Sequence, residues 1–331
     1  MDRKGGGTKI ILTLGVLKNQ SMYEKPTFEK YLQSFTPFYV NHDFDRQVLD
    51  TVNQEVEKYR HLIHQLDSYA GIEKFISEHP DSLRIILSLI DLSGERFKRI
   101  VTTIRIGRGD IVSTEWDEVK IRKEIIADVA FRRVIIGLFI DGSKSEIGSQ
   151  LPSYYLENVS LQSSAIAKLS DTFYLKRILK KVGDGKYNNS VGDKVEDLIA
   201  AELDKLGRKY GVTYSREKFV TWIDRNMDFC IPNEHDPYVI LESSFQVTTG
   251  SGQTTKRVDE LKAAAEIRNH NIQKGKNIAF VNLCDGAGWI GRQADLRRIY
   301  QASDYMLTIN TINRLEDIIL RHVPDKYLPG K

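Results

Sequence analysis

One carboxylate interrupts an apolar run near the C-terminal end of the chain, Tyr238-Val239-Ile240-Leu241-Glu242-Ser243-Ser244-Phe245. Side chains alternate between two faces along a strand, so Glu242, Ser244 and Gln246 share one face and the more apolar residues share the other. Burying a carboxylate in a strand is costly unless it is paired or bound to a metal ion. The run therefore predicts a strand with a polar, functional stripe.

A second carboxylate opens the preceding candidate strand, Asp228-Phe229-Cys230-Ile231-Pro232-Asn233. We expect the two strands to cover 227–232 and 238–247. If they are antiparallel neighbours, Asp228 and Glu242 can reach one ion, and their hard oxygen atoms suit a divalent cation. The alternative is that both are strand-edge charges facing water, which is the usual fate of a lone carboxylate.

A third carboxylate, Glu196, lies on an expected helix from about Gly192 to Leu206, beside apolar Val195 and Ile199. A divalent cation held by carboxylates lowers the pKa of bound water and stabilises charge on a phosphate. The order of the three acidic residues therefore favours metal-dependent hydrolysis of a phosphodiester.

The chain changes character near its middle. Mainly helices are expected up to about residue 185, and a polar break follows over 183–190. After the break, helices alternate with strands, which is typical of an α/β unit. We predict an α/β (α+β) protein with a mainly helical region for recognition or dimerisation over 1–185 and a core with a mixed central sheet over 186–331. The individual elements are expected as helices near 44–66, 80–90, 116–140, 192–206, 256–272, 292–300 and 312–322, and as strands near 212–215, 227–232, 238–247, 277–284 and 305–309.

Composition restricts the possibilities only slightly. The 331 residues carry 48 basic and 45 acidic side chains, which gives a net charge of +3. This net charge neither indicates nor excludes binding to nucleic acid. Cys230 and Cys284 lie in apolar runs and read as free thiols of a reducing compartment. The apolar run after Lys9 is too short for a signal peptide and is expected to start a strand or a buried helix. We expect no membrane span.

The order of Glu196 on a helix and of Asp228 and Glu242 on strands resembles the PD-(D/E)xK nuclease core. More narrowly, the chain resembles type II restriction endonucleases of the DpnII/MboI kind. The matching pieces are Gly192-Asp193-Lys194-Val195-Glu196, Asp228-Phe229-Cys230-Ile231, Ile240-Leu241-Glu242-Ser243-Ser244-Phe245, Thr249-Gly250-Ser251-Gly252-Gln253-Thr254-Thr255-Lys256 and Asp285-Gly286-Ala287-Gly288-Trp289.

The resemblance implies a Mg²⁺-dependent, sequence-specific endonuclease for double-stranded DNA, which leaves 5′-phosphate ends. Asp228, Glu242 and Glu196 would hold the ion. It also implies a homodimer in a prokaryotic cytoplasm, with a cognate DNA methyltransferase in the same restriction–modification system. Two alternatives stay open: a repair or structure-specific nuclease, and a DNA-binding protein with a decayed nuclease core.

One position departs from the common core, which has a lysine two residues after the strand glutamate. Ser244 occupies that position here, and we count it with Asp228, Glu242, Lys256 and Glu196 among the candidate catalytic residues. Lys256 ranks first as a substitute, because a cation stabilises the charge that develops on phosphorus. Gln246 shares the catalytic face and ranks second. The alternative is that Lys256 is a solvated lysine at a helix start.

The loop Thr249–Thr255 directly follows the proposed catalytic strand, so we expect it to face the substrate. Backbone N–H groups of its glycines can point at phosphate oxygens, and its polar side chains can reach the DNA backbone or base edges. The alternative is a flexible polar connection. The expected DNA contacts are Gly250, Ser251, Gly252, Gln253, Thr254 and Lys256.

The later turn Asp285-Gly286-Ala287-Gly288-Trp289 reads as structural. Its glycines permit a sharp turn at a strand end, and we expect Trp289 to pack over it. Asp285 is therefore not expected to be catalytic.

Overall fold

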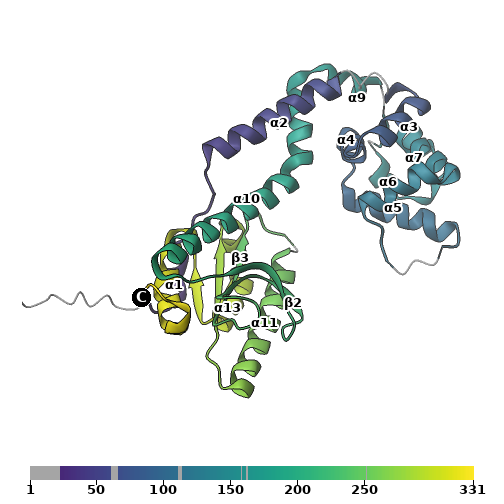
Figure 1. Cartoon of the computed structure of the whole chain (residues 1–331). Helices are drawn as coiled ribbons and strands as arrows, with labels where there is room; N and C mark the ends of the chain where they lie inside the picture. The colour runs from purple at the N-terminus through teal and green to yellow at the C-terminus, as the bar shows by residue number, and fades with distance from the viewer. Residues whose placement is uncertain (1–22, 61–65, 111–113, 158, 162, 251) are drawn as a thin grey trace, which may run out of the picture. The chain divides into compact units, whose positions relative to one another are not determined.

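The computed structural model describes the chain except for residues 1–22, 61–65, 111–113, 158, 162 and 251 (Figure 1). The apolar run after Lys9 and the expected DNA contact Ser251 lie outside the described residues. The chain divides into two compact units. The first combines the described part of Met1–Tyr39 with Gly192–Lys331, and the second is Val40–Val191. The predicted class, a helical region followed by a mixed α/β core, is confirmed.

The first unit contains one five-stranded sheet with the order β1-β2-β3-β4-β5. β1 to β3 are antiparallel, and β3 to β5 are parallel. The expected antiparallel pairing of the two acidic strands is confirmed, since Phe229 pairs with Leu241 and Ile231 with Val239. The strands are β1 (Ser215–Val220), β2 (Arg225–Ile231), β3 (Val239–Phe245), β4 (Ala279–Asp285) and β5 (Tyr305–Leu307).

The expected strand at 212–215 is wrong by several residues. The edge strand β1 begins at Ser215 and has the sequence Ser-Arg-Glu-Lys-Phe-Val. An edge strand exposes many of its side chains, so this one carries no apolar alternation that a sequence pattern could detect.

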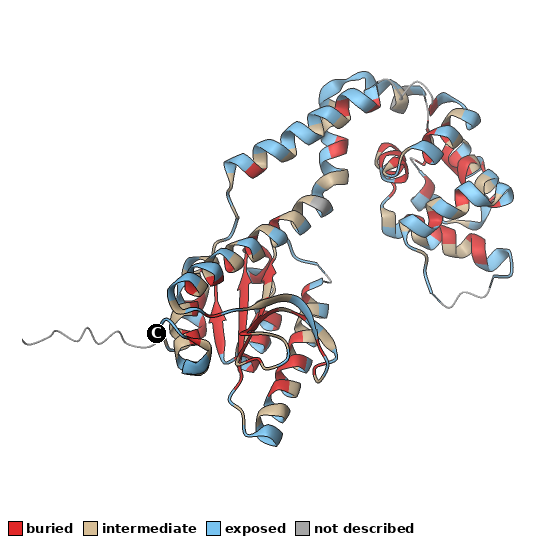
Figure 2. Ribbon diagram, in the orientation of Figure 1, coloured by how far each residue is buried: buried red, intermediate tan, exposed pale blue. Residues whose placement is uncertain are grey.

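Helices cover the buried strands, whose interior positions are coloured red in Figure 2. Small side chains, Ala263 and Ala264, let α11 lie close to Ile240 and Phe280 of the sheet, with which they form one core cluster. The helices of this unit are α1 (Phe28–Gln33), the second half of α10 (Thr172–Tyr210), α11 (Gly252–Lys274), α12 (Ala287–Ile290), α13 (Gln293–Ala302) and α14 (Leu315–His322), with 3-10 turns at Ile309–Arg314 and Asp325–Tyr327.

The segment before Val40 joins the sheet rather than the helical region. Tyr31 of α1 is buried, and its hydroxyl donates to the carbonyl of Cys284 at 2.5 Å. The backbone N–H of Thr36 donates to Asp285 at 2.7 Å. These contacts cross some 250 residues of sequence, which no local pattern reports.

The polar stretch 183–190 does not break the chain, contrary to our expectation. It lies inside α10, a helix of 39 residues from Thr172 to Tyr210. Leu179 before the stretch and Val191 and Val195 after it are buried, so packing on both sides maintains the helix. Glycine lowers helix stability by only about 1 kcal/mol relative to alanine, which such packing offsets.

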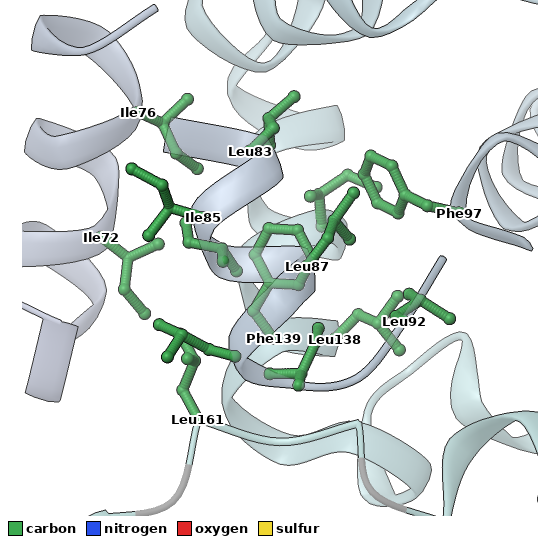
Figure 3. Close-up of a cluster of buried hydrophobic side chains, with 14 of the residues drawn as sticks. Ile72, Ile76, Leu83, Ile85, Leu87, Leu92, Phe97, Leu138, Phe139 and Leu161 are labelled. Atoms are coloured by element: carbon green, nitrogen blue, oxygen red, sulfur yellow. The ribbon is translucent and has the colours of Figure 1, made fainter. Parts of the chain in front are cut away.

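The second unit is helical, and its centre is apolar (Figure 3). The expected helix over 116–140 is two helices, because Asp128 caps a new one by accepting from the N–H of Phe131 at 2.9 Å. The helices are α2 (His42–Arg60), α3 (Tyr69–Glu78), α4 (Ser82–Leu89), α5 (Gly94–Gly107), α6 (Glu118–Ala127), α7 (Val129–Asp141), α8 (Ser153–Leu156), α9 (Ser163–Ala167) and the first half of α10, with 3-10 turns at Gly142–Lys144, Gly148–Gln150 and Lys168–Ser170. Among the helices of the described chain, none combines the length and the apolar character needed to cross a membrane.

Candidate active site

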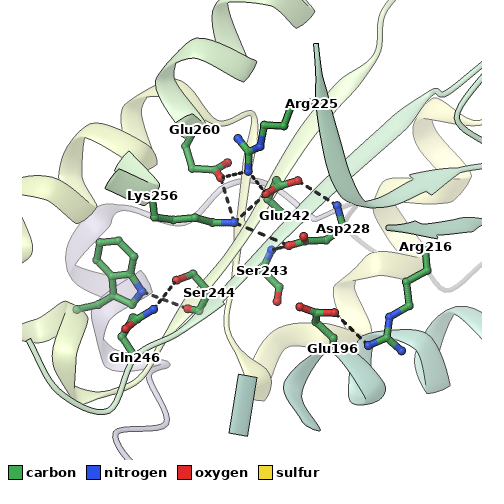
Figure 4. A network of polar contacts seen from close by, with 11 residues as sticks. Glu196, Arg216, Arg225, Asp228, Glu242, Ser243, Ser244, Gln246, Lys256 and Glu260 are labelled. Atoms are coloured by element: carbon green, nitrogen blue, oxygen red, sulfur yellow. Dashed lines mark hydrogen bonds and ion pairs between the residues drawn. The ribbon is translucent and has the colours of Figure 1, made fainter. Parts of the chain in front are cut away.

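The sheet opens where β2 and β3 separate, and two carboxylates lie at the opening (Figure 4). Backbone pairing stops at Phe229 and Leu241, one residue short of Asp228 and Glu242. There, Glu242 Oε1 accepts from the backbone N–H of Asp228 at 3.0 Å, and Asp228 Oδ2 accepts from the N–H of Ser243 at 2.7 Å. The two side chains thus replace the missing backbone bonds, and both carboxylates converge on one point.

Lys256 reaches the same point from the first turns of α11. Its Nζ lies 2.8 Å from Glu242 Oε2 and 3.8 Å from Asp228 Oδ2. The side chain is only 19% exposed, so it is not a solvated lysine at a helix start. The structure brings together three of the residues that the sequence singled out.

Ser244 and Gln246 form a separate pair beside this cluster. Gln246 donates from Nε2 to Ser244 Oγ at 3.4 Å, and the indole N–H of Trp289 donates to the Ser244 carbonyl at 3.1 Å. The described bonds of Ser244 therefore hold the end of β3 in place.

Two further charged residues belong to the cluster. Arg225 of β2 places Nη2 at 2.5 Å from Glu242 Oε2 and at 3.2 Å from Glu260 Oε1. Lys256 Nζ also lies 3.2 Å from Glu260 Oε1. Glu242 and Glu260 are both completely buried.

Our sequence interpretation missed both residues. Glu260 did leave a signal, because it precedes buried Ala263, Ala264 and Ile267 by three, four and seven residues and so lies on the buried face of α11. Arg225 lies next to a polar turn, and no sequence pattern indicates its role.

The cluster carries an excess of negative charge, since three carboxylates face two cationic side chains. Burial raises the pKa of Asp228, and the nearby Glu242 carboxylate raises it further. Burial also raises the pKa of Glu242, although Lys256 opposes that rise. An added positive charge would offset both effects, so the donor set fits a divalent cation in charge as well as in its oxygen atoms.

Glu196 lies near Asp228 but is already engaged. Its carboxylate accepts from Arg216 Nη2 at 3.0 Å, and the other terminal nitrogen of Arg216 donates to Asp197 at 3.1 Å. Burial raises the pKa of Glu196 while Arg216 opposes the rise, and the charge of Asp228 adds to it. Within the described ranges, no three His, Cys, Asp or Glu side chains gather closely enough to hold one ion. The arrangement suits Glu196 better for contact through water than for direct ligation.

The loop after β3 is built by its own side chains. Gln253 is 1% exposed, and its Oε1 accepts from the N–H of Gly250 at 2.6 Å while its Nε2 donates to the Thr248 carbonyl at 2.8 Å. Thr254 Oγ1 accepts from Arg292 Nη2 at 2.5 Å. The expected DNA contacts Gln253 and Thr254 thus hold the loop, and Gly250 and Gly252 are left exposed.

Asp285 is surrounded by backbone donors. Its carboxylate accepts from the N–H groups of Thr36 and Gly286, both at 2.7 Å, and of Ile309 at 2.9 Å. Burial raises the pKa of Asp285 to about 6, and the backbone donors oppose that rise. These contacts join three chain segments, in accord with the structural role expected.

The glycines beside Asp285 form a seat for the chain that leaves β3. Gly286 has a φ of 100°, and a Cβ there would lie 2.3 Å from the Gln246 carbonyl oxygen. A Cβ at Gly288 would lie 2.4 Å from the Thr248 carbonyl oxygen. Backbone therefore rests directly on backbone, and the N–H of Gly288 donates to the Gln246 carbonyl at 2.7 Å.

Comparison with known families agrees with the site. Residues 168–322 match the model of a family described as the BanI C-terminal domain. This match indicates a type II restriction endonuclease domain of the BanI-like kind, for which DNA is the substrate. A comparison with curated proteins gave no match. The predicted resemblance to type II restriction endonucleases is confirmed, whereas the narrower likeness to the DpnII/MboI kind stays a prediction.

Proposed function

We propose that this chain, with its BanI-like restriction endonuclease domain over 168–322, is a Mg²⁺-dependent, sequence-specific endonuclease of a restriction–modification system. One observation carries the proposal: the Asp228 and Glu242 carboxylates converge where β2 and β3 separate. Hard oxygen ligands at a single point, with charge in excess, are what a Mg²⁺ ion requires.

Asp228 and Glu242 would hold the ion, and Glu196 would assist through water because Arg216 already occupies its carboxylate. A Mg²⁺ ion at this point would lower the pKa of a bound water and offset charge on the scissile phosphate. Ser244 would take no part in proton transfer, since its hydroxyl accepts from Gln246 and its carbonyl from Trp289.

Lys256 would supply the positive charge that the common core takes from a lysine at the position of Ser244. Its Nζ lies within 4 Å of both acidic residues, so it can donate to a phosphate oxygen at that point. This placement argues against a decayed core, the alternative that Ser244 had suggested.

The reaction would be an in-line displacement at phosphorus. The oxygen of a water molecule would bond to phosphorus while the bond to the 3′ oxygen breaks, and the water would give up one proton to the solvent. The phosphate then stays on the 5′ side, and the 3′ oxygen takes up a proton. The products are 5′-phosphate and 3′-hydroxyl ends.

The exposed loop would contact the DNA through its backbone. The N–H of Gly252 would face a phosphate oxygen, while the N–H of Gly250 already donates to Gln253, and Gln253 and Thr254 fix the loop. Ser251 remains a proposed contact that lies outside the described residues.

Cutting both strands needs two active sites, so we propose a homodimer. The second unit, Val40–Val191, would provide target recognition, dimer contacts or both. A cognate DNA methyltransferase would protect the host sites in the same prokaryotic cytoplasm.

The test is cleavage of unmodified phage DNA by the full chain with and without Mg²⁺, followed by sequencing of the ends. Discrete Mg²⁺-dependent fragments with 5′-phosphates support the proposal. Cutting only at lesions or junctions supports a repair nuclease, and binding without cutting supports a decayed core. Glu242→Ala should abolish cutting while Glu266→Ala, further along α11, cuts normally. Normal cutting by Glu242→Ala removes that residue from the mechanism.

A further inference from the structure

Burying the Glu260 carboxylate carries a large free-energy cost. Its side chain is completely buried, and Oε2 has no hydrogen-bond partner among the described residues. Nη1 of its partner Arg225 is likewise buried without one. A buried ion pair is weak evidence for stability, because an apolar pair of similar volume is often as stable or more so. The neighbours Ala263 and Ala264 show that this face of α11 accepts apolar residues.

Two cationic side chains bind the same carboxylate oxygen atom of Glu242. Lys256 Nζ and Arg225 Nη2 both bind Oε2, at 2.8 and 2.5 Å. Glu242 is also a proposed ligand of the divalent ion. A divalent ion at Glu242 would repel both cationic groups, and the repulsion is strong because the site is buried.

Glu260 offers both cations a second partner. Its Oε1 lies 3.2 Å from Lys256 Nζ and 3.2 Å from Arg225 Nη2. It stands four residues after Lys256 on the same helix, so α11 fixes the distance between them. Lys256 can therefore stay beside the reacting phosphate when Glu242 is taken up by the ion.

We infer that Arg225 and Glu260 are a positioning pair that holds Lys256 in place while Asp228 and Glu242 bind the divalent ion. The inference rests on the proposed function and adds two residues to it. Neither residue touches the substrate. Arg225 orients the Glu260 carboxylate, and Glu260 holds the Lys256 ammonium group.

The test uses Glu260→Gln, Arg225→Met and the double variant of the full chain, with Glu266→Gln on the same helix as the matched control. Three quantities are measured: the cleavage rate of unmodified phage DNA at saturating DNA and Mg²⁺, the DNA concentration giving half the maximal rate, and unfolding in urea. Mn²⁺ binding to the DNA-free protein is followed by calorimetry.

We expect Glu260→Gln to lower the maximal rate about 100-fold, the scale of losing one preorganised electrostatic contact, with little change in the half-saturating DNA concentration. Mn²⁺ binding should weaken by less than about tenfold, because Glu260 contributes charge but no ligand atom. The control should match the wild type in all four measurements.

The double variant separates positioning from mere stability. Each single change leaves an uncompensated buried group, so it destabilises the fold, whereas removal of both restores stability. We expect the double variant to unfold like the wild type but to cut as poorly as Glu260→Gln. If its cutting returns together with its stability, or if Glu260→Gln cuts normally, the positioning role is wrong.

The experiment distinguishes failure of the positioning pair from failure of the proposed function. Wild-type protein and Glu242→Ala are run beside the variants. Failure of the wild type to cut with Mg²⁺, or normal cutting by Glu242→Ala, overturns the proposed function and the pair with it. A cutting wild type, an inactive Glu242→Ala and a normal Glu260→Gln overturn the pair alone.

Discussion

The two units bury very different side chains. In the described residues of the second unit, the buried polar or charged side chains are Ser82, Arg105 and Ser145. Among the described residues of the first unit, four acidic side chains are buried, at Glu242, Glu260, Asp285 and Asp295. Because each buried charge must be compensated, a protein keeps such groups where chemistry or a specific junction needs them. The second unit therefore holds together by packing, and the proposed chemistry lies in the first.

The buried acids of the first unit also differ from one another. Asp285 accepts from three backbone N–H groups, which cannot move away from it without unfolding the turn. Glu242 accepts from two side-chain cations and one backbone N–H. Partners on side chains can exchange for an ion and a substrate, whereas backbone partners cannot. This contrast separates a structural carboxylate, Asp285, from the proposed catalytic one, Glu242.

Asp228→Asn should have the largest effect on the cleavage rate among the variants that test this contrast. We expect the cleavage rate to fall at least about 1000-fold, the upper range for loss of one electrostatic group in an active site. The fold should persist, since the amide keeps an acceptor for the N–H of Ser243. Initial rates and urea unfolding check this. Asp325→Asn, at an exposed aspartate, is the control, and a variant inactive only because it is unfolded would contradict the prediction.

The same variant should change how stability depends on pH. Burial and Glu242 raise the pKa of Asp228 above its unfolded value of about 4. Its contribution is therefore fully present below about pH 4 and is lost as the pH rises through the folded-state pKa. In metal-free buffer, the wild type should lose stability relative to Asp228→Asn over that rise. A constant difference between them would contradict this.

Phe139→Ala should destabilise the second unit and leave the residues of the candidate active site unaffected. Phe139 is completely buried and lies against Phe97, with ring centroids 5.7 Å apart. Its truncation should cost about 3–5 kcal/mol of stability. Hydrogen exchange should speed up in α3 to α7 and stay slow in β3 and β4. Val119→Ala, at an exposed position, should change stability by less than about 0.5 kcal/mol.

Asp285→Ala tests the structural carboxylate. It leaves the N–H groups of Thr36, Gly286 and Ile309 without their acceptor, so we expect a loss of about 2–3 kcal/mol. Urea unfolding measures the loss. At a temperature where the variant is folded, its cleavage rate should stay within tenfold of the wild type. A loss of rate as large as that of Asp228→Asn would erase the distinction between the two carboxylates.

The smallest effect should come from Glu217→Gly on β1. Glu217 has a φ of 52°, a conformation that costs a residue with a Cβ about 1 kcal/mol and costs glycine little. The variant should gain up to about 1 kcal/mol, although glycine also loses more entropy on folding. Lys218→Gly, one residue further, should instead lose stability. Equal losses at both positions would show that the backbone at Glu217 is not strained.

The buried strands of the sheet and the two main carboxylates could be predicted because their signals are local, whereas the edge strand β1 could not. Apolar residues with a single acid mark β3, and a short polar turn before it makes β2 its antiparallel neighbour. Once that pairing is assumed, Asp228 and Glu242 lie opposite each other. Lys256 was reachable by the same logic, as the first cation after the strand.

The rest depended on contacts that no local pattern records. Glu260 shows its role only when α11 lies on the sheet and Arg225 comes up from β2. Gln253 reads as a polar loop residue until its amide is seen to bond the loop backbone. The continuity of α10 through its polar stretch likewise follows from packing on either side of it.

The glycine seat beneath the end of β3 has a consequence for the substitutions that the following segment can accept. Gly286 and Gly288 meet carbonyl oxygens of Gln246 and Thr248, not their side chains. The two glycines thus constrain the backbone path at Gln246 and Thr248 without involving the side chains of these residues. Substitutions at Gln246 and Thr248 can therefore leave in place the strand that carries Glu242, the proposed ligand of the ion.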